Sequence, residues 1–231
     1  MSDAVLLLSD VSYRWPGRDA FSISIPELLI KKGETVLLLG ESGSGKSTLL
    51  SLISGIIQPK DGEIEVAGTN IAELSGAMRD RFRAEQIGVV FQQFNLLPFG
   101  RVAENILLPL RFAPERRKRA GNAIDEARRL CVALGLGRDV LYRKASSLSV
   151  GQQQRVAVAR ALIGQPELII ADEPTSALDA NTQAAFMDLL FSQTRAQHTA
   201  LLMGSHDERL GGQFDRVIHI SEIAEIGRTA A

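Results

Sequence analysis

The first part of the chain alternates short apolar runs with polar turns, a pattern that predicts β-strands. Strand-like runs cover residues 5–8, 11–15, 21–25, 35–39, 63–66 and 87–91. The run at 35–39 is almost wholly apolar and stops at Gly40, which is typical of a strand buried on both faces. Beyond Gly40, the apolar residues between 49 and 53 fall on one face of a helix that begins near Lys46.

The second part of the chain is helical and then returns to strands. A helical pattern with scattered prolines and glycines runs from about 102 to 164. Strand-like runs follow at 168–171, 200–204 and 217–220, with a helix at about 179–195 between the first two. Buried strands that alternate with helices predict a mostly parallel sheet flanked by helices. We therefore expect the α/β class.

Composition and charge narrow the class of protein further. The 231 residues are 45% hydrophobic and 23% charged with a net charge of −1, which predicts a folded protein without the basic field that binds nucleic acid. The basic run at 115–119 is expected to be a solvated helix face, with contact to an anionic lipid or a partner as the alternative. Cys131, the only cysteine, excludes an intrachain disulfide, favours a reducing compartment and is expected to be buried on a helix.

The chain shows no sign of entering a membrane by itself. Its start, MSDAVLLLSD, has no basic residues and only a short apolar run, so we expect no signal peptide. No segment approaches the ~20 apolar residues that cross a bilayer. Any membrane role is therefore expected to work through a partner.

Residues 40–48, GESGSGKST, fit the phosphate-loop pattern G-x-x-x-x-G-K-[ST] between a buried strand and a helix. The glycines let backbone N–H groups turn toward phosphate oxygens, and the helix start adds its positive dipole end. Lys46 would place its charge on the β- and γ-phosphates, and Ser47 would offer its hydroxyl to Mg²⁺. The alternative is a glycine-rich turn with a surface lysine. The candidate nucleotide residues here are Gly40, Glu41, Ser42, Gly43, Ser44, Gly45, Lys46, Ser47 and Thr48.

Two successive acids, Asp172 and Glu173, follow the apolar run at 168–171. Asp172 suits Mg²⁺, directly or through water, and Glu173 suits polarising the attacking water. Adjacent acids at the end of a strand are common by themselves. Together with the phosphate loop, they indicate a functional pair.

Residues 146–155, SSLSVGQQQR, look like a second phosphate site at a helix start. Ser149 is expected to cap the helix with its hydroxyl, and Gly151 permits close approach. A capped helix within one domain is the alternative. It explains Ser149 but neither the glycine nor the run of glutamines.

Further motifs accompany these three: LSVGQ at 148–152, PTSALD at 174–179, Gln92 in VVFQQFN and His206 in MGSHD. In this order and over nearly the whole chain, they resemble the ATP-binding cassette (ABC) transporter ATPases. The resemblance implies a P-loop NTPase core with an N-terminal antiparallel β region and an inserted α-helical subdomain. It divides the single domain 1–231 into a core of 1–91 and 165–231 and a helical subdomain of 92–164.

The resemblance also explains why one chain needs two phosphate sites. In this family two copies stack head to tail, and the signature helix of one caps the γ-phosphate held by the phosphate loop of the other. Ser149, Gly151 and Gln152 then serve the nucleotide of the second copy. Val150 stands where the family usually has glycine, and a β-branched residue there restricts the backbone.

Single residues carry further roles by the same resemblance. Trp15 matches the aromatic residue that stacks on adenine; packing at a strand end is the alternative, and Tyr13 is the weaker candidate. Gln92 matches the residue that senses Mg²⁺ and the attacking water, and Asp179 the acid that crosses the dimer interface. His206 matches the histidine that contacts the γ-phosphate, with serine before it where threonine is usual. We expect His198 and His219 to be structural.

The stretch FQQFNLLP at 91–98 and the following VAENI resemble the subgroup that includes LolD, MacB and FtsE. This likeness implies ATP and Mg²⁺ as cofactors, a separate permease with few transmembrane helices, and a cytoplasmic protein peripheral on the inner face of the cell membrane. Its apolar residues would either line a groove for the permease or pack under the helical insertion. They are Phe94, Leu96, Leu97 and Phe99.

Two other functions are alternatives to the transporter hypothesis. A soluble ABC ATPase without a transport role, of the iron–sulfur assembly type, shares the motifs, but the FQQFNLLP loop favours a transporter. A P-loop kinase or GTPase would leave LSVGQ and His206 unexplained.

Overall fold

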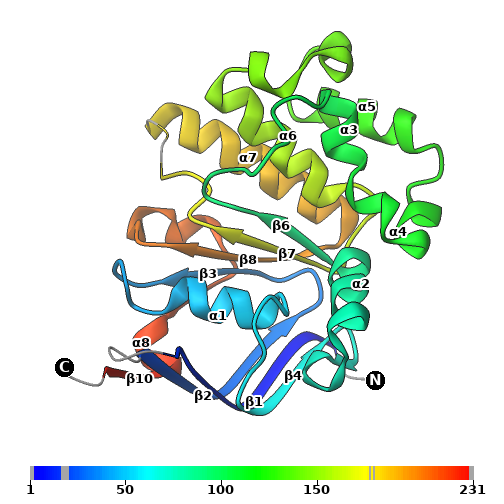
Figure 1. Cartoon of the computed structure of the whole chain (residues 1–231). Helices are drawn as coiled ribbons and strands as arrows, with labels where there is room; N and C mark the ends of the chain where they lie inside the picture. The colour runs from blue at the N-terminus through cyan, green and yellow to red at the C-terminus, as the bar shows by residue number, and fades with distance from the viewer. Residues whose placement is uncertain (1–2, 17–20, 177, 179, 229–231) are drawn as a thin grey trace. The chain divides into compact units, whose positions relative to one another are not determined.

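The computed structural model describes residues 3–16, 21–176, 178 and 180–228 (Figure 1). The chain forms two compact units. The first unit consists of Met1–Asp80 and Ala200–Ala231, and the second of Arg81–Thr199.

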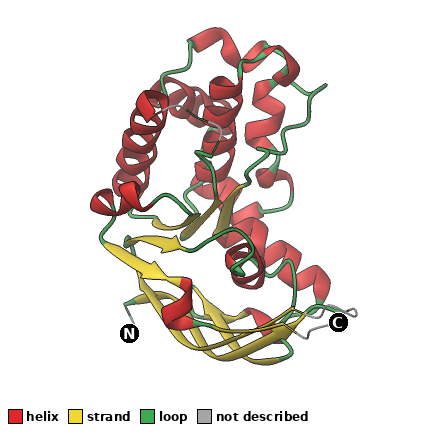
Figure 2. Ribbon diagram, turned by 90° about the vertical axis from the view of Figure 1, so that its left-hand side faces the viewer, coloured by secondary structure: helices red, strands yellow, loops and turns green. Residues whose placement is uncertain are grey.

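An antiparallel sheet forms one layer of the first unit (Figure 2). Its strand order is β10-β2-β1-β4-β5. The strands are β1 (Ala4–Arg14), β2 (Phe21–Lys31), β4 (Asp61–Val66), β5 (Thr69–Asn70) and β10 (Glu225–Arg228). The two strands predicted at 5–8 and 11–15 are one strand, β1, with a register shift against β4 between Ser9 and Ser12. Asp10 absorbs this irregularity with a φ of 50°.

Three parallel strands form the second layer of this unit, with β3 (Thr35–Leu39) between β8 (Ala200–Ser205) and β9 (Arg216–His219). Every residue of β3 is buried, as its apolar run predicts. Helix α1 (Lys46–Ile53) contacts both β4 and β8, and α8 (Ile220–Ile223) contacts β2 and β9 (Figure 1). The phosphate loop therefore leaves the central parallel strand and enters a helix packed on its neighbour. Short 3₁₀ turns lie at Ile71–Glu73 and Glu208–Gln213.

The second unit is mostly helical around the parallel pair β6 (Ile87–Val90) and β7 (Leu168–Asp172). Its helices are α3 (Val102–Leu107), α4 (Pro114–Arg119), α5 (Ala123–Ala133), α6 (Val150–Leu162) and α7 (Ala180–Gln197). Helix α6 packs against α3, α5, α7 and β6 (Figure 1). A Cβ on Gly88 would lie 2.3 Å from the carbonyl oxygen of Ala161, so β6 approaches α6 this closely only with glycine. Short 3₁₀ turns lie at Pro109–Arg111, Arg138–Tyr142 and Ala145–Ser147.

Helix α2 (Gly76–Gln86) runs across the division between the units, and the sequence did not predict it. Its only buried residue is Glu85, so it has no apolar stripe that a periodicity argument could detect. The α/β class, with an antiparallel region and parallel strands flanked by helices, is confirmed. The numbered division into a core and a 92–164 subdomain stays a prediction.

The prediction of a solvated basic face at 115–119 is wrong for Arg116, whose side chain is 1% exposed. Its guanidinium donates to four backbone carbonyls: Ile163 (2.7 Å), Ala84 (2.9 Å), Ile87 (3.0 Å) and Ala161 (2.5 Å). Some of these carbonyls end helices and would otherwise have no donor. Burial lowers the pKa of Arg116 to about 9.

Two further expectations concern Cys131 and membrane crossing. Cys131 is fully buried on α5, as expected, and burial raises the pKa of its thiol to about 12. Among the described residues, no helix combines the length and the apolar character that crossing a membrane requires.

Candidate functional site

The glycine-rich loop of the first unit has the backbone of an anion cradle. Gly43 and Gly45 have φ values of 77° and 94°, which side-chain-bearing residues rarely adopt. Gly45 is the N-cap of α1 and makes no side-chain cap hydrogen bond. A Cβ on Gly45 would lie 2.8 Å from Phe21 Cζ, so the position also excludes larger residues by space. The left-handed glycines and the dipole of the helix start suit a phosphate.

Lys46 lies within this loop and is buried. Its Nζ donates to the carbonyl oxygens of Gly40 (2.6 Å) and Glu41 (3.0 Å). These contacts hold the ammonium group on the loop instead of in solvent, which contradicts the alternative of a surface lysine. Ser47, the next residue, is exposed.

Trp15 is tied to the helix that follows the loop. Its Nε1 donates to Thr48 Oγ1 at 3.2 Å, and its ring meets Tyr13 edge-on, with centroids 5.3 Å apart and planes at 88°. The side chain is 41% exposed. An edge-on neighbour leaves a ring face for a flat ligand, so this geometry is compatible with stacking on a base.

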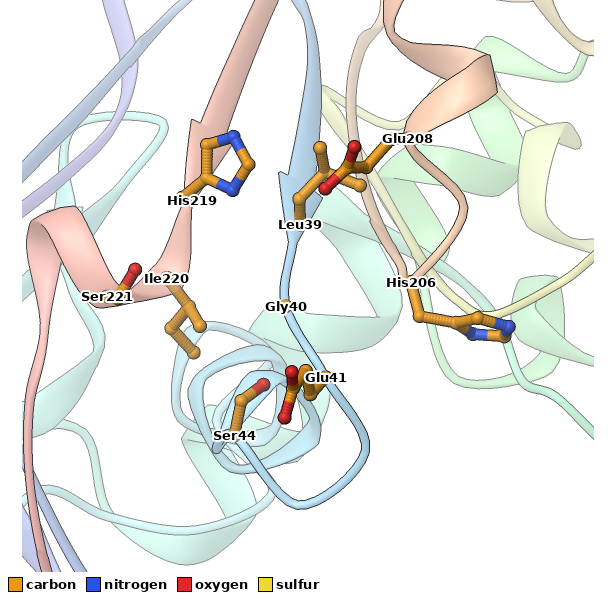
Figure 3. Close-up of a pocket in the computed structure, with 9 residues that line it drawn as sticks. All are labelled: Leu39, Gly40, Glu41, Ser44, His206, Glu208, His219, Ile220 and Ser221. Carbon is orange, nitrogen blue, oxygen red and sulfur yellow. The ribbon is translucent and has the colours of Figure 1, made fainter.

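A cavity of about 410 Å³ lies beside the loop at the carboxyl ends of the parallel strands (Figure 3). His206 follows β8 and His219 ends β9, on either side of Gly40 (Figure 3). The other lining residues are Leu39, Glu41, Ser44, Glu208, Ile220 and Ser221. His219 is exposed and borders this cavity where the chain turns into α8, and its backbone N–H donates to Glu222 Oε2 at 3.3 Å as the N-cap of that helix. The expectation that His219 is structural stays a prediction.

Ser205, the residue before His206, has a hydroxyl that accepts a hydrogen bond within the turn. Ser205 Oγ accepts the backbone N–H of Asp207 at 3.0 Å, and the carbonyl of Ser205 accepts the N–H of Gly40 at 3.3 Å. The turn bearing His206 is thus joined to the start of the phosphate loop. Serine supplies the same acceptor as threonine, so this departure from the family pattern is mild.

In the second unit, Asp172 ends β7 and Glu173 follows it in a left-handed conformation, with a φ of 45°. Such a backbone costs about 1–3 kcal/mol in a residue with a side chain and is frequent at functional sites. Ser176 Oγ donates to the Glu173 carbonyl at 3.1 Å and lies 3.4 Å from Gln92 Nε2, which donates to it. The Gln92 amide and the Glu173 backbone carbonyl are therefore linked through the Ser176 hydroxyl. The sequence alone did not indicate this role of Ser176.

The start of α6 has the predicted cap. Ser149 Oγ accepts the N–H of Gln152 (3.3 Å), and the Gln152 side chain accepts the N–H of Ser149 (3.2 Å), which is a capping box. Val150 opens the first turn of α6 with a side chain that is 55% exposed. A Cβ on Gly151 would meet no atom within 4 Å, so this surface is open. Asp179 lies outside the described residues.

Each unit carries oxygen donors of the kind that Mg²⁺ prefers. The first unit has the Ser47 hydroxyl, and the second has the Asp172 carboxylate and the Gln92 amide. Within the described parts of the chain, no three His, Cys, Asp or Glu side chains form a metal site by themselves.

The residues of the apolar loop after Gln92 differ in their burial. Phe94 is buried, whereas Leu97 is exposed and Phe99 is 89% exposed. The loop therefore packs through one residue and presents others to solvent.

Comparison with known proteins gives one consistent family. Residues 24–176 match the profile of the family described as ABC transporter. The chain is 41% identical over 194 residues to the ABC transporter ATP-binding protein YbbA of Escherichia coli (strain K12), covering 84% of this chain and 83% of YbbA. It is 39% identical over 206 residues to the lipoprotein-releasing system ATP-binding protein LolD of Xanthomonas axonopodis pv. citri (strain 306), covering 88% and 83%. A dimeric, post-hydrolysis structure of the ATP-binding cassette MJ0796 bound to ADP and Pi matches with a TM-score of 0.77 at 35% identity, covering 93% of each chain.

Proposed function

The chain belongs to the ABC transporter ATP-binding family and is an ATPase, and from this we propose that two copies, stacked head to tail, hydrolyse ATP to drive a separate membrane permease. Each copy would hold one nucleotide on its own phosphate loop. The signature helix of the other copy would close that site.

The first unit supplies the nucleotide contacts in this proposal. The loop N–H groups between Gly40 and Thr48 and the buried Lys46 hold the phosphates, and Trp15 stacks on the adenine. His206 contacts the γ-phosphate. Mg²⁺, held by Ser47, Gln92 and Asp172, would neutralise charge on the phosphate oxygens.

Glu173 is the general base. It accepts a proton from water while the water oxygen bonds to the γ-phosphorus and the bond from that phosphorus to the β-phosphate oxygen breaks, which yields ADP and inorganic phosphate. The left-handed backbone at Glu173 and the Ser176 link from its carbonyl to Gln92 support this assignment, because both restrain the backbone that bears the acid.

The observation that carries the head-to-tail arrangement is the exposed start of α6. The chain has a complete phosphate loop, yet Ser149, Val150 and the open surface at Gly151 form a second helix start with free approach. A second helix start of this kind would be functional if it binds the nucleotide held by a second copy. Asp179 would cross the same interface.

The permease contact would lie on the apolar loop. Phe99 and Leu97 offer apolar surface to solvent within one short loop, which suits docking of an apolar partner segment. We propose a permease with few transmembrane helices, so that the protein is cytoplasmic and peripheral on the inner face of the membrane. The net charge of −1 speaks against nucleic acid as a partner.

Substitution of Glu173 tests the enzyme assignment. Glu173→Gln should retain ATP binding, lower turnover on the order of 10²–10⁴-fold and accumulate a dimer with ATP in size-exclusion chromatography. Turnover at the parental rate would refute Glu173 as the base.

Two further variants test the division of work between the copies. Lys46→Ala should weaken nucleotide binding itself, whereas Ser149→Arg should leave binding intact and stop turnover, because it damages the site of the other copy. Mixing the two variants should restore one working site per dimer. Turnover that does not depend on protein concentration or on Ser149 would refute the dimer.

Co-purification tests the transporter assignment. From detergent extracts the protein should be recovered with an integral membrane protein, and Phe99→Ser should reduce that recovery. Recovery without any membrane protein would favour a soluble ABC ATPase.

A further inference from the structure

Helix α6 is largely buried inside the second unit. From Val156 to its end at Leu162 every residue is buried, although Ser149 at its start is exposed. It packs against three helices and against β6, with the glycine contact at Gly88 fixing its C-terminal end (Figure 1). An element held on so many sides has one position relative to its neighbours.

Gln154 joins this helix to the loop of the catalytic acid. The side chain is 1% exposed, and its Nε2 donates to the carbonyl oxygen of Pro174 at 2.7 Å. Pro174 directly follows Glu173, whose φ of 45° must be enforced by its surroundings. The bond from Gln154 fixes the peptide group next to this strained residue.

Arg160 joins the same helix to the loop of Gln92. Its guanidinium is buried and donates through Nη1 to the Asn95 carbonyl (2.7 Å) and through Nη2 to the Phe94 carbonyl (2.5 Å). Phe94 and Asn95 have φ values of 56° and 47°, two left-handed residues in succession. A planar fork that holds two adjacent carbonyls suits the maintenance of such a turn. Burial lowers the pKa of Arg160, because removing the charged guanidinium from water is unfavourable.

We infer that Gln154 and Arg160 are positioning residues for ATP hydrolysis: from one helix they hold the loops of Glu173 and Gln92 in working geometry. This inference rests on the proposed function for the roles of Glu173 and Gln92. Because that helix begins at Ser149, a ligand that engages Ser149 acts on an element that fixes both groups of the same chain.

The test removes each donor while keeping the size of the side chain. Gln154→Met and Arg160→Met are compared with Arg155→Met on the same helix, whose Nη1 donates to the Gly135 carbonyl (3.3 Å) and reaches neither loop. Both test variants should lose kcat on the order of 10²-fold, since small displacements of catalytic groups have effects of this size, with the KM for ATP within about twofold. The control should keep the parental kcat.

Hydrogen exchange of the nucleotide-free protein provides the readout that a merely structural role would not give. Gln154→Met should speed amide exchange at 173–176 but not at 92–98, and Arg160→Met should do the reverse. Arg160→Lys, which keeps the charge and one donor group, should recover part of the kcat and tests the same contact should Arg160→Met fail to fold.

Two results would overturn the inference. One is a kcat within about twofold of the Arg155→Met control in both test variants. The other is faster exchange of both loops in each variant together with a general loss of stability. The Glu173→Gln variant separates this failure from failure of the proposed function: if it stops turnover while the positioning variants do not, only the positioning role is lost.

Discussion

Replacing Arg116 by methionine should destabilise the protein severely, because this side chain satisfies backbone groups from several elements at once. Its guanidinium bonds to carbonyls at the end of α2, the start of β6 and the C-terminal end of α6, and its backbone N–H donates to Glu85 Oε2 at 2.7 Å. Methionine fills a similar volume but donates no hydrogen bond.

The size of the effect follows from two opposing terms. Each buried carbonyl left without a donor costs about 1–3 kcal/mol, and the buried Glu85 carboxylate also loses a nearby positive charge. Against this, methionine removes the desolvation that lowers the pKa of Arg116 to about 9. Loss of one member of a buried charged network usually dominates, so we expect a net loss of about 4 kcal/mol. In a protein of this length, this corresponds to a fall in Tm of about 8–16 °C.

Urea denaturation followed by circular dichroism measures this loss, with Arg117→Met as the matched control. Arg117 is the next residue on α4 and is exposed, so its substitution should change the free energy of unfolding by no more than about 0.5 kcal/mol. Arg116→Lys should fall between the two, because one ammonium group cannot reach all four carbonyls. If Arg116→Met unfolds within about 1 kcal/mol of the control, the carbonyls find other donors and the reasoning is refuted.

Three further predictions rest on single contacts. Gly164→Ala should destabilise by about 2 kcal/mol or more in the same assay, because the new Cβ would lie 2.5 Å from the carbonyl oxygen of Arg116 at a φ of 69°; an unchanged midpoint would contradict this. ATP should change the fluorescence of Trp15, the only tryptophan, and Thr48→Val should alter the response because it removes the bond that orients the ring; a signal insensitive to ATP would exclude stacking. Cys131 should resist thiol reagents at pH 8 until the protein is denatured, since burial raises the pKa of its thiol to about 12; rapid labelling of the native protein would show that α5 opens easily.

The sequence predicts those elements whose burial pattern is local. The strand Thr35–Leu39 and the start of α1 at Lys46 stand where the pattern placed them, because a continuous apolar run and a one-faced helix leave a direct trace in the residue types. Helix α2 and strand β10 leave no such trace. The first has no apolar stripe, and the second is a short edge strand whose existence depends on pairing with β2.

The candidate site divides in the same way, and the reason is chemical. Residues that would meet the nucleotide lie in contiguous motifs, because a phosphate or a magnesium ion selects the side chain or the glycine at each position. The groups that support them bond to backbone carbonyls instead: Gln154 to Pro174, and Arg160 to Phe94 and Asn95. Any residue type provides a carbonyl, so the acceptor leaves no mark in the sequence.

Only the side chain that donates can then be recognised from the sequence, and only where its neighbours in the sequence are apolar. Arg160 stands among valines and alanines in VAVARALI, where a charge within an apolar helix must find a partner, so its burial could have been inferred. Arg116 stands in ERRKR, where each neighbour is also charged, and the same argument cannot separate the one buried guanidinium from the exposed ones. Arg116 is buried where its guanidinium meets the carbonyls that end α2 and α6, so it becomes identifiable only once those helix ends are placed in space.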